Sequence, residues 1–200
     1  MKKYRLCPVS LNLENKACLV IGGGNIAEKR VRAVLDCGAQ VRVISPQVTP
    51  VLARLSQRGS IVWIRDIFRE AHLGSPDVIC GATDDPSANA WIYNLAKKRH
   101  CLVNLADDPR HCDFHFPAVV RRGHLAVAVS TDGQSPAFAA WLAKLLDDLL
   151  DRYLGRVLAR YAQLRPKMKA LYPRMTDRAQ AWQRMLDEEG PRVLAVSSKQ

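Results

Sequence analysis

Residues 17–27 read ACLVIGGGNIA, a short apolar run that ends abruptly in three glycines. An amphipathic segment, residues 25–35, follows at once. This order predicts a buried strand, a tight glycine turn and a helix. The spacing Gly22-x-Gly24-x-x-Ala27 matches the dinucleotide-binding fingerprint, with alanine in its last position.

Each position of the fingerprint has a physical reason. Gly22 permits the tight turn, Gly24 lets a pyrophosphate approach the backbone, and the small Ala27 lets helix and strand pack closely. The N-terminus of the helix offers free N–H groups and the positive end of its dipole. We therefore predict a bound dinucleotide at the turn and the helix start, with Gly22, Gly23, Gly24, Asn25 and Ile26 as binding residues. The alternative is a turn with only a structural role.

Strands alternate with helical patterns in the residues that follow. Further strands are expected at 41–44, 61–64, 77–82 and 101–105, and further helices near 48–55 and 87–98. This alternation predicts an α/β fold, a Rossmann-like doubly wound parallel sheet.

The rhythm changes after residue 107. Extended segments at 114–120 and 125–130 flank a turn at 121–124 and predict a β-hairpin. A long helix is expected at 137–149, and residues 151–189 are helical in pattern with interruptions at Pro166 and Pro173. The sequence thus predicts a small β-rich region and C-terminal helices after the sheet.

Ligands of a doubly wound sheet lie across the carboxyl ends of its strands. Two further strand ends therefore join the predicted cofactor site: Ser45, Pro46 and Gln47 on one, Thr83 and Asp84 on the other. No acidic residue stands ~20 positions after the fingerprint, where one commonly binds a ribose. Arg42 could accommodate the 2′-phosphate of NADP, but it lies inside an alternating strand. NAD is favoured over NADP.

Asp107 follows the last predicted strand of the sheet. A carboxylate on this edge is placed for proton transfer, although Asp107-Asp108-Pro109 is also an ordinary turn sequence. The nearby cluster of residues 111–115 contains two histidines and a cysteine. Its spacing matches no standard structural zinc pattern, so no metal ligands are predicted.

The chain has 200 residues, 48% of them hydrophobic, and a net charge of +11. No apolar run approaches the ~20 residues that span a bilayer, and no apolar segment follows the basic N-terminus. We expect a cytoplasmic protein whose six cysteines are reduced. Nine Lys or Arg residues stand between Arg152 and Arg184 against one acid, which indicates a polyanionic ligand or a solvated helix face.

Several motifs in order give the chain a family resemblance. They are residues 19–24, 27–30, 81–85, 103–109, 112–114, 116–118 and 130–136. In this combination the sequence resembles the precorrin-2 dehydrogenase family, which includes the N-terminal part of bacterial siroheme synthases.

The resemblance implies NAD-dependent oxidation of precorrin-2 to sirohydrochlorin in siroheme biosynthesis, with insertion of Fe²⁺ by the same protein in some members. It implies that Asp107 is the catalytic residue and that the protein is a homodimer. The domains would be an NAD-binding domain (1–112), a dimerisation and substrate region (113–150) and a C-terminal helical domain (151–200). A chain of this length would lack the methyltransferase module of the fusion enzymes.

Two positions depart from the family pattern. Thr131 stands where some relatives have a second serine, and Asp132 replaces a more usual glycine. The rival interpretation is a non-catalytic NAD-binding sensor that contacts a partner through its basic helices, although no nucleic-acid-binding motif is evident.

Overall fold

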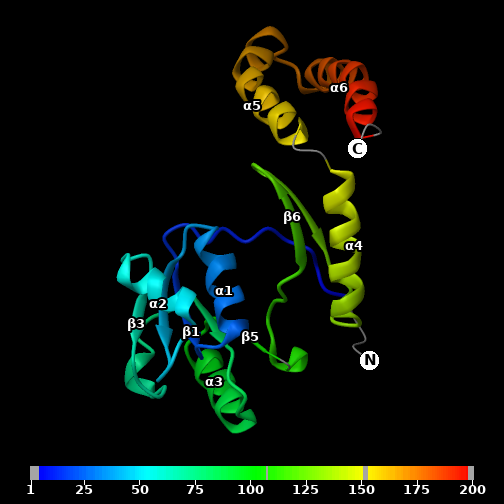
Figure 1. Ribbon diagram of the computed structural model, residues 1–200. Helices are drawn as coiled ribbons and strands as arrows, with labels where there is room; N and C mark the ends of the chain where they lie inside the picture. The colour runs from blue at the N-terminus through cyan, green and yellow to red at the C-terminus, as the bar shows by residue number, and fades with distance from the viewer. Residues whose placement is uncertain (1–4, 107, 151–152, 198–200) are drawn as a thin grey trace. The chain divides into compact units, whose positions relative to one another are not determined.

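The computed structural model describes residues 5–106, 108–150 and 153–197, with side chains as far as residue 189. The chain divides into two compact units, residues 1–115 and 116–200. The first unit contains, in chain order, β1 (Ala17–Ile21), α1 (Asn25–Leu35), β2 (Gln40–Ile44), α2 (Pro50–Gln57), β3 (Val62–Ile64), η1 (Glu70–His72), β4 (Val78–Gly81), α3 (Pro86–Lys98), β5 (Leu102–Leu105) and η2 (Pro109–His111) (Figure 1).

The five strands form one parallel sheet in the order β3-β2-β1-β4-β5. The chain moves outward from β1 to β3 and then returns to the other side of β1. The strand order therefore reverses between β1 and β4, which is where a doubly wound sheet binds its ligand. The predicted fold class is confirmed.

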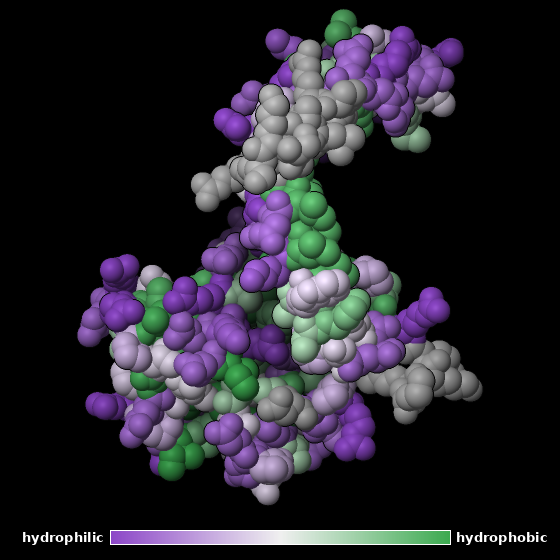
Figure 2. All heavy atoms as spheres, turned by 45° about the vertical axis from the view of Figure 1, so that its right-hand side comes forward, coloured by the Kyte–Doolittle hydropathy of each residue, from purple (hydrophilic) through white to green (hydrophobic). Residues whose placement is uncertain are grey.

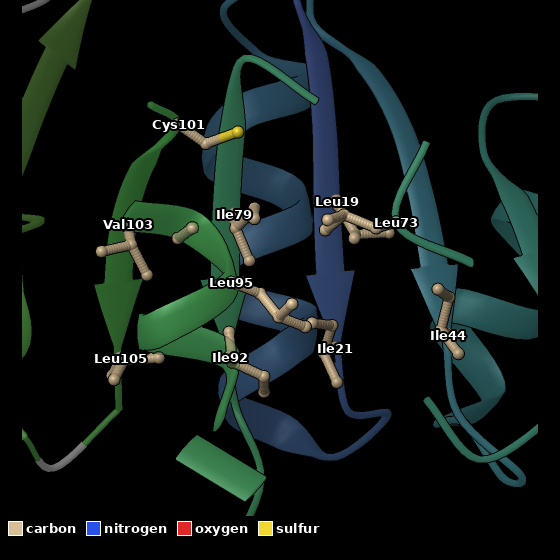
Figure 3. Close-up of a cluster of buried hydrophobic side chains, with 11 residues drawn as sticks. Leu19, Ile21, Ile44, Leu73, Ile79, Ile92, Leu95, Cys101, Val103 and Leu105 are labelled. Carbon is tan, nitrogen blue, oxygen red and sulfur yellow. The ribbon is translucent and has the colours of Figure 1, made fainter. Parts of the chain in front are cut away.

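Both faces of the sheet are covered by helices. Successive residues of a strand point to opposite faces, and in β1 the side chains on both faces are buried. Leu19 and Ile21 of β1 join a core cluster with Ile92 and Leu95 of α3 (Figure 3). The intervening Val20 is also fully buried, as is Val31 of α1. An unbroken apolar strand such as β1 is typical of a sheet with helices on both sides.

The second unit begins with a hairpin of β6 (Ala118–Arg122) and β7 (Leu125–Val129). Arg121 and Arg122 belong to β6, so the expected turn at 121–124 is shorter than predicted. The helix α4 (Pro136–Leu149) packs Ala139 and Ala143 against this hairpin. Small residues at these two positions let the helix approach the strands closely.

Two helices follow, α5 (Tyr153–Leu171) and α6 (Met175–Ser197). The prediction of a helix break at Pro166 was wrong, because α5 continues through that exposed residue. The helices meet through Tyr161 and Trp182, whose rings stack at 5.3 Å. The carboxylate of the buried Glu189 accepts a hydrogen bond from the Tyr153 hydroxyl and lies 3.4 Å from an Arg160 Nη1 atom. No helix in the described part of the chain could cross a membrane.

Candidate functional site

The turn between β1 and α1 packs against two other strand ends. Gly22 has a φ of +114°, and a Cβ atom there would lie 2.2 Å from the Ala82 carbonyl oxygen. A Cβ atom on Gly23 would lie 1.9 Å from the Gln47 carbonyl oxygen. Glycine is therefore required at both positions by the protein's own backbone.

Gly24 differs from its two neighbours. A Cβ atom there would meet nothing within 4 Å, so the space beside Gly24 is open. Gly24 is also the N-cap of α1, and no side chain caps the first N–H groups of that helix. Uncapped N–H groups facing open space are the feature that binds a pyrophosphate in dinucleotide-binding folds.

The exit of β2 is fixed by side-chain hydrogen bonds. The buried Ser45 donates its Oγ hydrogen to the Gln47 carbonyl at 2.6 Å, and Trp63 Nε1 donates to the Ser45 carbonyl at 2.9 Å. Thr49 caps α2 by accepting from the Leu52 N–H. The Thr49 hydroxyl also donates to Glu28 Oε2 at 2.7 Å, and this bond links the start of α2 to α1.

The Glu28 carboxylate is held in its ionised form. The Thr49 hydroxyl is the main cause, and the Arg32 guanidinium at 2.9 Å adds to it. Both hydrogen bonds favour the charged carboxylate and lower the pKa of Glu28 below 4.5.

The exit of β4 is held by α3. Thr83 Oγ1 donates to Asn89 Oδ1 at 3.0 Å, and Asn89 Nδ2 donates back to the Thr83 carbonyl at 3.2 Å. Asp85 caps α3 by accepting from the Ser87 N–H at 2.8 Å. These bonds leave Asp84 exposed beside the glycine turn.

A cavity of about 520 Å³ lies between these strand ends. Its walls include every predicted cofactor residue except Gln47: Gly22, Gly23, Gly24, Asn25, Ile26, Ser45, Pro46, Thr83 and Asp84. Gln47 does not line the cavity, and its carbonyl group packs against the backbone of Gly23. The open space at Gly24 and the uncapped helix start within this cavity fit a dinucleotide.

The sequence did not reveal the apolar wall of the cavity. Ile67 and Phe68 come from the segment after β3, and Trp91 comes from α3. The Phe68 and Trp91 rings pack at 5.1 Å, while Ile67 remains 67% exposed. An apolar wall beside a polar turn suits the flat ring of a nucleotide base. No local sequence signal indicated that these residues form one wall.

Asp107 lies outside the described residues, so the structure does not place its carboxylate. The strand before it is well defined, and the Ala106 N–H extends the pairing of β5 with β4 by donating to the Gly81 carbonyl. The Asp108 Oδ2 atom lies 2.6 Å from His111 Nδ1, and this hydrogen bond lowers the pKa of the Asp108 carboxyl group. In the described part of the chain no group of three or more His, Cys, Asp or Glu residues could hold a metal ion.

Arg42 is excluded as a cofactor contact by its own bond. Its Nη2 atom donates to the Leu73 carbonyl at 2.8 Å, and the side chain lines a different pocket with Gln40 and Ser75. That pocket is at the amino ends of the strands, on the opposite edge of the sheet from the glycine turn.

The fold and this cavity together define a Rossmann-type dinucleotide-binding protein. The model of an NAD(P)-binding family matches residues 9–118, and that of the sirohaem biosynthesis protein central family matches residues 122–148. The chain belongs to this NAD(P)-binding family.

Individual relatives agree with the family match. The chain is 37% identical over 91% of its length to siroheme synthase 1 of Aeromonas salmonicida, and 37% identical over 90% to siroheme synthase 3 of Aeromonas hydrophila. It spans about two fifths of the length of these relatives. Among solved structures, it is similar to SirC, a precorrin-2 dehydrogenase, with a TM-score of 0.77, 25% identity and coverage of 98% of this chain and 100% of that one.

Proposed function

We propose that the protein oxidises precorrin-2 to sirohydrochlorin with NAD⁺, as a step of siroheme biosynthesis. The observation that carries the proposal is the dinucleotide cavity at Gly24, in a chain that is similar over its whole length to a precorrin-2 dehydrogenase. A bound NAD⁺ supplies the hydride acceptor. The start of α1 would hold its pyrophosphate, and the wall of Ile67, Phe68 and Trp91 would hold its adenine ring.

Asp107 is the residue to which we assign the proton. Oxidation of the macrocycle removes a hydride and a proton, and the proton needs a base. The strand β5 ends at Leu105, at the same edge of the sheet as Gly22, and Asp107 comes two residues later in the sequence. A carboxylate there can accept the proton as the hydride leaves.

The basic C-terminal helices supply a reason for a polyanionic substrate. Arg165, Lys167 and Lys169 of α5 are exposed, as is Arg184 of α6. No carboxylate pairs with these four residues in the described part of the chain. Exposed cations without partners attract a substrate that bears many carboxylates.

The direct test supplies precorrin-2 and NAD⁺ and follows NADH by absorbance. We expect Asp107→Asn to abolish NADH formation while Asp108→Asn, the matched change of the neighbouring carboxylate, retains most of it. Full activity of Asp107→Asn with unchanged folding would refute the assignment of the base. Absence of NADH with the wild-type protein would refute the proposed function.

Insertion of Fe²⁺ into the product is a second activity to be tested on the same sample. Iron here is a substrate, and the macrocycle nitrogens are its ligands. After NADH formation is complete, Fe²⁺ or Co²⁺ is added and the spectrum of the metallated product is followed against a protein-free control. A rate above that of the control identifies a chelatase, and an equal rate identifies a dehydrogenase alone.

We further propose a homodimer that forms through α4. Its residues Phe138, Trp141, Leu145 and Leu149 are 52%, 59%, 43% and 56% exposed and lie on one side of the helix. Figure 2 shows apolar side chains gathered along α4 in green. A stripe of four large apolar residues on one helix is typical of a protein interface.

The oligomeric state tests this surface. We expect Trp141→Glu to convert a dimer into a monomer in sedimentation velocity. Ala140→Glu adds the same charge on another side of α4, where the helix is also exposed, and should leave the dimer intact. A wild-type monomer at micromolar concentration would refute the interface.

We also infer a cytoplasmic location, because all six cysteines are free thiols.

A further inference from the structure

The exit of β2 lacks the carboxylate that selects NAD over NADP. In dinucleotide-binding folds an Asp or Glu at this position binds the 2′-hydroxyl of the adenosine ribose and repels a 2′-phosphate. Here β2 ends at Ile44 and is followed by Ser45 and Pro46, both of which line the cavity. The carboxylates lining the cavity in the described structure are Asp84 and Asp85, which follow β4 rather than β2.

Arg65 occupies the neighbouring position at the exit of β3. Its Nε atom lies 3.4 Å from the Pro46 carbonyl oxygen, and its guanidinium lies 5.4 Å from the centre of the Trp63 ring. Because Trp63 is itself bonded to the Ser45 carbonyl, both side chains are tied to the exit of β2. Arg65 therefore lies next to Pro46, a residue of the cavity wall, at the strand end where a dinucleotide-binding fold holds the adenosine ribose.

The charge of Arg65 is not neutralised within the described structure. The adjacent Asp66 pairs instead with Arg69 at 3.2 Å and with His72 at 3.5 Å. Arg65 is exposed, and one Nε contact leaves the remaining N–H groups of its guanidinium available. An arginine stacked on an aromatic ring with free N–H groups is suited to bind a phosphate.

We propose that Arg65 binds the 2′-phosphate of NADP⁺, so that the site accepts NADP⁺ as well as NAD⁺. This inference rests on the proposed dinucleotide site and concerns its ribose end alone. Arg65 takes the role that the sequence pattern offered to Arg42. Arg42 cannot fill this role because its guanidinium is hydrogen-bonded to the Leu73 carbonyl on the opposite edge of the sheet. The missing carboxylate removes the repulsion, and Arg65 adds the attraction.

The test measures dissociation constants of NAD⁺ and NADP⁺ by titration calorimetry, without substrate. We expect the wild-type protein to bind the two within about tenfold of each other. Arg65→Ala should weaken NADP⁺ by about tenfold or more, as expected for loss of a charged hydrogen bond, and change NAD⁺ less than about twofold. Arg58→Ala removes the same charge from the exposed C-terminal end of α2 and should change neither constant.

Two results would overturn the role of Arg65 while the dinucleotide site stands. One is NADP⁺ binding more than about tenfold weaker than NAD⁺ in the wild-type protein. The other is an equal loss of both dinucleotides in Arg65→Ala. If neither dinucleotide binds the wild-type protein, both this inference and the proposed site are wrong.

Discussion

The backbone of Gly23 lies directly against the backbone of Gln47, so that a Cβ atom on Gly23 would fall 1.9 Å from the Gln47 carbonyl oxygen. The Gly23 carbonyl in turn accepts a hydrogen bond from the Thr49 N–H at 3.0 Å. The glycine turn is therefore a packing contact between the β1 and β2 exits before it is a ligand site.

Gly23→Ala should destabilise the first unit. The added methyl group meets backbone atoms, which cannot rotate away as a side chain can. We expect a loss of about 3 kcal/mol, at the upper end for an overpacked site. Urea unfolding followed by circular dichroism measures it. A variant as stable as the wild type would show that the exits of β1 and β2 do not touch in this way.

Gly24→Ala should separate binding from stability. Its methyl group enters open space, and the residue already has φ −81°, a conformation that alanine adopts freely. We expect a stability loss below about 1 kcal/mol, the usual cost of alanine at an N-cap. Dinucleotide affinity should fall by about tenfold or more, because the methyl group occupies the space through which the pyrophosphate approaches. Unchanged affinity in calorimetry would place the pyrophosphate elsewhere.

Local pattern was sufficient for the elements around this turn. The predicted bounds of β1 and α1 agree with the structure, because an apolar run, a glycine turn and a helical repeat leave little ambiguity. The parallel sheet followed from the alternation of strands and helices. The position of Ser45 and Thr83 beside the turn followed from the rule that parallel strands share one carboxyl edge.

Features that depend on tertiary contacts were beyond the sequence pattern. Nothing local to Ile67 or Trp91 indicates that a loop and a helix 24 positions apart form one cavity wall. The same is true of Arg42 and Arg65, whose roles depend on which carbonyl group each reaches. Pro166 was misjudged because the propensity of one residue is a local signal, and the rest of α5 forms a continuous helix in spite of the proline inside it.

Arg122→Ala should destabilise the second unit. The Arg122 guanidinium donates to the Leu150 carbonyl at 2.6 Å, to the Asp147 carbonyl at 2.6 Å and to the Asp147 carboxylate at 2.8 Å. It thus ties β6 to the C-terminal end of α4, where unpaired carbonyl groups need donors. We expect a loss of about 2 kcal/mol in the free energy of unfolding, from hydrogen bonds made by a charged group that is 17% exposed.

Arg121 provides the matched control for this change. It precedes Arg122 in β6 and its side chain is exposed, so Arg121→Ala should change the unfolding free energy by less than about 0.5 kcal/mol. Equal effects of the two changes would mean that the contacts of Arg122 with α4 do not stabilise the unit. Because Arg122 makes these contacts within the unit, its role is structural. The exposed Arg121 is the better candidate for contact with an anionic substrate.

Glu28→Gln should remove part of the dependence of stability on pH. The bond from Thr49 lowers the pKa of Glu28 in the folded protein below 4.5, its value in an unfolded chain. A lowered pKa stabilises the fold above the unfolded value, and this stabilisation is lost as the pH falls through the folded value. The wild type should therefore exceed the variant in stability near pH 7, and the difference should shrink below pH 4.5. Urea unfolding at both pH values, with the exposed Glu14→Gln as control, measures the difference; a constant difference would contradict the assignment.

Asp132→Gly should stabilise the loop before α4. Asp132 has a φ of +52°, in the left-handed region that costs energy for a residue with a Cβ atom. The structure thus gives a physical reason for the glycine that the related family more usually has at this position. We expect a gain of up to about 1 kcal/mol in the free energy of unfolding, reduced by the greater freedom of glycine in the unfolded chain. The control is Gln134→Gly, in the same loop but without a positive φ, which should lower the free energy of unfolding by a few tenths of about 1 kcal/mol. A similar loss for Asp132→Gly would show that the aspartate side chain stabilises the loop.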